Sequence, residues 1–68
     1  MNDSGIAELL KTIADIIIAA ASERRPSGEV YAMLLPIGVT LATYEAIVAT
    51  LVEIGKIKVD GHHRLTLA

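Results

Sequence analysis

The sequence predicts a small α+β domain in which three helices precede a C-terminal β-hairpin. Two patterns along the chain predict it. Apolar residues recur at helical spacing in three stretches, the last of which ends at Gly55. Beyond that glycine the spacing becomes two, because polar and apolar residues alternate in residues 56–59 and again in residues 64–67. The chain has only 68 residues, so residues 1–68 are expected to form one domain with a small core.

The first helix is predicted over residues 6–22, with Asp3 or Ser4 as its N-cap. Its core-facing side is predicted from six residues at helical spacing: Ile6, Leu9, Leu10, Ile13, Ile17 and Ala20. Further apolar residues widen the apolar arc to roughly 200°, although ~100° is enough for one buried side. This flanking stripe comprises Ala7, Ala14, Ile18 and Ala21. It indicates either a helix set deep in a small core or a second, intermolecular contact, such as the interface of a homodimer.

A second and a third helix are predicted on either side of a turn that contains Gly38. Pro26 ends the first helix, and Ser27 is expected to cap the second, which covers about residues 28–35. Thr40 is expected to cap the third helix. Gly38 suits the turn because glycine readily adopts a positive φ. The buried positions predicted in these two helices are Val30, Tyr31, Leu34, Leu35, Leu41, Tyr44, Ile47, Val48, Leu51 and Val52.

The two strands of the hairpin must pair in a register that puts their apolar residues on one side. A two-residue turn at residues 60–61 would place Ile57 opposite Arg64, although cross-strand partners share a face of the sheet. Loops of three or five residues place Ile57 opposite Leu65 or Leu67 instead. An odd number of loop residues, or a bulge, is therefore predicted.

The three-residue loop would also gather positive charge. It makes Lys58 and Arg64 cross-strand neighbours on the outer face, with Lys56 beside them and His62 at the tip of the hairpin. These residues would form a compact basic patch. Lysines on an outer strand also deter sheet-to-sheet association, so the patch is interpreted either as a solvated edge or as a surface for a nucleic-acid backbone.

The order of helix, turn, helix and hairpin resembles the winged helix-turn-helix family. The matching segments are Pro36-Ile37-Gly38-Val39-Thr40, Leu51-Val52-Glu53-Ile54-Gly55-Lys56-Ile57 and Arg64-Leu65-Thr66-Leu67. The resemblance covers nearly the whole chain and implies a winged-helix fold, in which a short strand before the second helix often pairs with the hairpin. It also implies a DNA-binding regulator that contacts phosphate through the hairpin and the start of the third helix. The candidate nucleic-acid contacts are Arg24, Arg25, Thr40, Thr43, Lys56, Lys58, His62 and Arg64.

The third helix, however, lacks the residue types that usually read bases. Arg or Lys contact guanine and Asn or Gln contact adenine, and none of these occurs in residues 41–53. Residues 26–55 hold three glutamates and no Lys or Arg, which is unfavourable next to phosphates. The sequence therefore favours a non-catalytic interaction module that self-associates or docks on another protein through the first helix. A DNA-binding regulator is the alternative.

No pattern indicates catalysis, a cofactor, a metal site or a small-molecule substrate. The chain has no cysteine, which excludes disulfides and thiolate ligands. His62 and His63 are adjacent, so on a strand they would point to opposite faces and could not easily bind one ion. The sequence has no phosphate-binding loop and no nucleophile with an evident base. The apolar run of residues 16–21 is too short for a membrane span of ~20 residues, so a soluble protein is expected. The lack of cysteine is typical of a reducing compartment, so a cytoplasmic location is expected.

Overall fold

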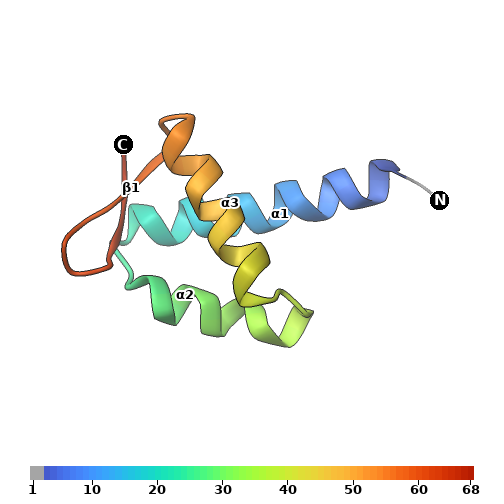
Figure 1. The fold of residues 1–68 in the computed structure, drawn as a ribbon, viewed down its shortest axis with the longest axis horizontal. Coiled ribbons are helices and arrows are strands. Elements are labelled where there is room, and N and C mark those ends of the chain that lie inside the picture. The colour runs from blue at the N-terminus through green and yellow to red at the C-terminus, as the bar shows by residue number, and fades with distance from the viewer. Residues whose placement is uncertain (1–2) are drawn as a thin grey trace.

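The computed structural model of the chain describes residues 3–68. Its elements in chain order are α1 (Asp3–Ser22), α2 (Ser27–Leu34), the 3-10 turn η1 (Leu35–Ile37), α3 (Leu41–Glu53), β1 (Ile57–Val59) and β2 (Leu65–Leu67). Figure 1 shows the hairpin of β1 and β2, called the wing below, beside the C-terminal end of α1. The predicted α+β fold of three helices followed by a β-hairpin is confirmed, and the arrangement is consistent with a winged helix.

The core lies between the C-terminal half of α1, the two shorter helices and the inner face of the wing. Its largest fully buried side chains come from α1, α2 and the wing: Ile17, Val30, Leu34, Ile57 and Leu65. From α3, Tyr44 and Leu51 are also buried, and the Tyr44 ring lies 5.5 Å from the ring of Tyr31 between centroids. Burying an aliphatic side chain of this size contributes about 1.5–3 kcal/mol, so these few residues hold the domain together.

The N-terminal half of α1 extends beyond the body formed by the other elements (Figure 1). We call this half, residues 3–12, the overhang. Leu9 and Leu10, predicted to lie in the core, are instead 53% and 44% exposed, whereas Ile13 is buried. The prediction is wrong there because no other described element covers that part of α1, so its core-facing side meets no neighbour. Three predicted cap and core side chains lie outside what the structure describes: Asp3, Ser4 and Ile6.

Thr40 caps α3 as predicted, while Ser27 has a different role. The Thr40 Oγ1 accepts a hydrogen bond from a backbone N–H of the first turn at 3.2 Å. Gly38 follows η1 with the expected positive φ, at 88°. Pro26 rather than Ser27 occupies the N-cap position of α2. The Ser27 hydroxyl lies 2.8 Å from the Tyr44 hydroxyl instead, so it ties the start of α2 to α3.

The buried side of α3 is narrower than predicted. Tyr44 and Leu51 are buried, while Ile47 and Val48 are half-buried. Some predicted core residues are exposed, and these lie at the ends of α2 and α3: Leu35, Leu41 and Val52. Leu34 and Leu51, which directly precede Leu35 and Val52, are buried, so the exposed residues lie on sides of the chain that face away from the core.

The wing pairs in one of the two registers that the sequence pattern allows. Ile57 lies opposite Leu67, so a loop of five residues joins the paired strands, as in the longer alternative. The three-residue alternative is wrong, because Lys58 lies opposite Thr66 rather than Arg64. This register puts the apolar residues of both strands on one face, and β2 packs with that face against α1.

The segment between α1 and α2 joins the edge of the wing. Pro26 forms an antiparallel bridge with Arg64, and the Leu65 N–H donates a hydrogen bond to the Arg25 carbonyl at 3.0 Å. The resemblance to winged-helix proteins predicts a short strand at this place, and the structure has a single bridge there. It holds the end of α1 beside the wing.

Candidate functional site

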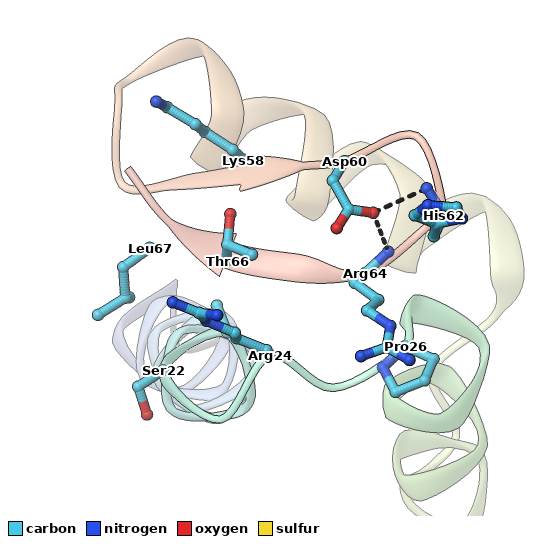
Figure 2. Close-up of a pocket in the computed structure, with 10 residues that line it drawn as sticks. Ser22, Arg24, Pro26, Lys58, Asp60, His62, Arg64, Thr66 and Leu67 are labelled. Atoms are coloured by element: carbon cyan, nitrogen blue, oxygen red, sulfur yellow. Dashed lines mark hydrogen bonds between the residues drawn. The ribbon is translucent and has the colours of Figure 1, made fainter.

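A hollow of about 880 Å³ lies between the end of α1 and the wing. Its lining residues come from α1, the segment before α2, both wing strands and the wing loop (Figure 2): Ala21, Ser22, Arg24, Pro26, Lys58, Asp60, His62, Arg64, Thr66 and Leu67. Three of these carry a positive charge, from Arg24, Lys58 and Arg64, and one is a carboxylate. We call this site the basic hollow.

Arg24 occupies a backbone position that usually belongs to glycine. At the end of α1 the Arg24 N–H donates to the Ala21 carbonyl at 3.0 Å, and the Arg25 N–H donates to the Ala20 carbonyl at 3.2 Å. This is the Schellman pattern, in which the residue after the helix is left-handed. Arg24 accordingly has φ 58°, which costs a non-glycine residue roughly 1–2 kcal/mol. Stability alone would therefore favour glycine at this position.

Asp60 organises the wing loop. Its Oδ1 accepts hydrogen bonds from the backbone N–H groups of His62 at 2.8 Å and Arg64 at 3.0 Å (Figure 2). These bonds, the one from Arg64 above all, lower the pKa of Asp60 below its ordinary value. His63 completes the loop with φ 59°, a second non-glycine residue in the left-handed region. The Asp60 carboxylate is thus ionised and engaged by backbone donors of the loop.

The basic hollow contains half of the residues predicted to contact nucleic acid. Those inside are Arg24, Lys58, His62 and Arg64, and those outside are Arg25, Thr40, Thr43 and Lys56. The sequence pattern gave no indication that the arginine pair lies beside the cations of the wing. Pairing of the segment before α2 with the wing is the signal that could have predicted it. Ser22 and Thr66, whose hydroxyls add polar groups to the lining, were not singled out by their sequence pattern.

Three of the residues outside the basic hollow are engaged locally. Arg25 pairs with the carboxylates of Glu23 and Glu29, and its hydrogen bonds to them raise its pKa above the ordinary value. Thr40 Oγ1 donates a hydrogen bond to Thr43 Oγ1 at 3.0 Å. A phosphate at Arg25 or at the start of α3 would have to compete with these contacts.

A second site is an apolar groove of about 510 Å³ between α1 and α3, which we call the α1–α3 groove. Its lining residues are Leu10, Lys11, Ala14, Thr43, Ala46, Ile47, Thr50 and Leu51. On the α1 side it begins in the overhang, at the exposed Leu10. On the α3 side, the Thr50 hydroxyl donates to the Ala46 carbonyl at 2.9 Å, so its polar group is satisfied within the helix.

The stripe predicted for an intermolecular contact divides along α1. Ala7 is exposed on the overhang, Ala14 lines the α1–α3 groove and Ile18 is half-buried. Ala21 is only 1% exposed because β2 packs against that end of α1, so the structure corrects its predicted role in the contact. Leu10 enters the surface instead, although its spacing assigned it to the core.

Comparison with known proteins gives no match: no family model, no curated protein and no solved structure matches the chain. Among residues 3–68, no group of three or more His, Cys, Asp or Glu side chains is placed to hold a metal ion. No helix in this part of the chain has the length and apolar character needed to cross a membrane. Function is therefore inferred from the basic hollow and the α1–α3 groove.

Proposed function

We propose that the chain is a non-catalytic interaction module that self-associates through the overhang and the α1–α3 groove. One observation carries the proposal: α1 continues past the body while its core-facing side stays apolar. Leu9 and Leu10 are about half exposed there, and the apolar surface runs on from Leu10 into the groove. An exposed apolar surface of this kind usually marks an interaction site on a small domain.

The α3 side of the groove favours a protein partner over a DNA duplex. It offers Thr43, Ala46 and Thr50, which lack the paired donors and acceptors that distinguish base pairs in the major groove. The overhang also runs beside this face, so a duplex would have to approach past it. In contrast, Ala14 and Ala46 are small enough for another helix to approach closely.

Self-association through this surface is expected to be weak. The groove side of each copy brings one half-exposed leucine, Leu10, and several alanines, far less apolar area than an obligate dimer buries. A small interface must also offset the loss of translational and rotational freedom on association. The dissociation constant should therefore lie between micromolar and millimolar.

Backbone amide NMR spectra recorded from about 20 µM to about 1 mM would map the contact. The amides of Leu10, Ala14 and Ala46 should shift with concentration, because their surroundings change on pairing. Amides of the wing, residues 57–67, serve as the internal control and should shift much less. Spectra that do not change with concentration, or changes confined to the wing, would contradict the proposal.

The second candidate function is weak binding of a nucleic-acid backbone in the basic hollow. The observation that favours it is that Arg24, Lys58 and Arg64 all line one hollow. Arg24 is present there despite a backbone conformation that favours glycine, which supports a use for its side chain. These cations lie at the end of α1 and on the wing, outside α3, so they would contact phosphates, and binding would be independent of sequence.

A salt titration with a short DNA duplex tests this second function. Three phosphate contacts predict that affinity falls about 40-fold between about 50 and about 200 mM salt. Lys58→Gln should reduce the slope of log affinity against log salt by about one contact, and Lys58→Gln with Arg64→Gln should abolish binding. Lys56→Gln is the matched control, because Lys56 directly precedes the wing but does not line the basic hollow. An equal effect of Lys56→Gln, or sequence-selective binding at physiological salt, would overturn this interpretation.

A further inference from the structure

We infer that the α1–α3 groove binds the overhang of a second copy of this chain, with the two α1 helices antiparallel. The inference rests on the proposed self-association and specifies its partner and geometry. Each copy carries both halves of the contact, a protruding helix and the groove beside it. A two-fold axis can therefore bury both grooves at once and close the assembly at two chains.

The shape of the chain favours the antiparallel direction. The groove lies beside Leu10, Lys11 and Ala14, where α3 already packs near α1. The overhang extends beyond the body and can lie beside the groove of a second copy, whereas the other half of α1 packs against α2, α3 and the wing (Figure 1). In a parallel pair, the bodies of the two copies would lie at the same end of the paired α1 helices and would crowd each other. An antiparallel pair sends the bodies to opposite ends.

Helical spacing sets the register of this pair. Ala7 and Ala14 are seven residues apart, so they lie on the same side of α1, and Leu10 lies between them on the groove side. Centring the two-fold axis near Leu10 places Ala7 of each copy opposite Ala14 of the other. The two Leu10 side chains then meet near the axis, and the alanines on either side allow the helices to approach closely.

The charges at the edge of the groove agree with this register. Lys11 lies at the groove edge, and its Nζ donates to the Asp15 Oδ2 at 3.2 Å on the same helix. In the antiparallel pair, Glu8 of the second copy comes within about one helical turn of Lys11. Each lysine is thus placed between a carboxylate of its own chain and one of the other chain. A parallel pair would bring Lys11 against the apolar side of the second helix instead.

Disulfide cross-linking between introduced cysteines tests the arrangement. The chain has no cysteine of its own, so every disulfide must involve the introduced residues. A tagged Ala7→Cys chain is mixed with an untagged Ala14→Cys chain at millimolar concentration and oxidised. The mixed disulfide should form at least tenfold faster than either homodimeric disulfide. In this register, position 7 of one copy lies seven residues along the axis from position 7 of the other, and the same holds for position 14. At 1.5 Å per residue this is about 10 Å, beyond the ~7 Å Cα separation that a disulfide spans. Ala32→Cys, exposed on α2, measures the rate of random collision.

The outcomes separate the arrangement from self-association itself. Rapid mixed cross-linking between positions 7 and 14 supports the antiparallel pair. If the chain forms dimers and Ala7→Cys instead cross-links to itself, the arrangement is overturned and the proposed self-association stands. If every pair cross-links at the Ala32→Cys rate and the chain sediments as a monomer, both are overturned.

Discussion

Leu34→Ala is expected to lower the free energy of unfolding by ~2–5 kcal/mol. Leu34 is 1% exposed in the core, so the truncation removes buried apolar area and leaves a cavity that α1 and α3 can only partly fill. The total stability of a domain of 68 residues is about 3–10 kcal/mol at ~0.05–0.15 kcal/mol per residue. The truncation should therefore remove between about a fifth and all of the stability of the domain.

The adjacent leucine supplies a matched control for this change. Leu35 is 50% exposed, so Leu35→Ala removes the same atoms without creating a cavity and should cost less than ~1 kcal/mol. Urea unfolding followed by circular dichroism measures both variants under the same conditions. Equal losses of stability at the two positions would show that α2 does not present Leu34 to the core.

Leu10→Glu is expected to weaken self-association at least tenfold without unfolding the domain. In the proposed pair, the two new carboxylates would meet near the two-fold axis in an apolar groove, where burying like charges together is strongly unfavourable. The monomer should keep its fold, because Leu10 is 44% exposed and both leucine and glutamate are good helix formers. Sedimentation equilibrium gives the dissociation constant, and circular dichroism verifies the fold.

Leu35→Glu is the matched control for Leu10→Glu, with the same chemical change at a residue of similar exposure outside the groove. It should leave the dissociation constant within about twofold, which is under 0.5 kcal/mol. An equal effect at both positions would indicate general charge repulsion rather than a contact at the groove. Unfolding of Leu10→Glu would instead place Leu10 in the core of the domain.

Local chemistry predicted the order of the elements and several of their ends. Thr40 and Gly38 have the roles expected of them, because a threonine cap and a positive φ depend on neighbouring residues alone. The apolar alternation limited the wing to two registers, one of which is observed through Ile57 and Leu67. The choice between them depends on the packing of β2 against α1, which alternation within the strands does not determine.

Helical periodicity identified the apolar side of α1. It did not show how much of that side is buried by the other elements. Leu9 and Leu10 share the spacing of Ile13, yet the body stops short of them. Ala21 was assigned to an outer flank, and the wing covers it. In both cases the burial is decided by where elements distant in the sequence end, and spacing within one helix contains no such information.

The basic hollow was predictable only in parts. The cations of the wing were identified, but joining them to Arg24 required the bridge between Pro26 and Arg64. The sequence pattern assigned Arg24 and Arg25 the same candidate role in nucleic-acid contact. The chain turns at Arg24, whose φ is positive, and the Arg25 side chain pairs with Glu23 and Glu29. Two adjacent arginines therefore have different surroundings, because the positive φ of Arg24 changes the direction of the chain between them.

The most direct test of the central claim is the mass of the wild-type chain in solution. Sedimentation equilibrium from about 10 µM to about 1 mM covers the range expected for a weak dimer. Self-association through the overhang and the α1–α3 groove predicts that the mass rises from 7.2 kDa toward twice that value and stops there, because a two-fold contact closes. A mass of 7.2 kDa over the whole range would contradict it.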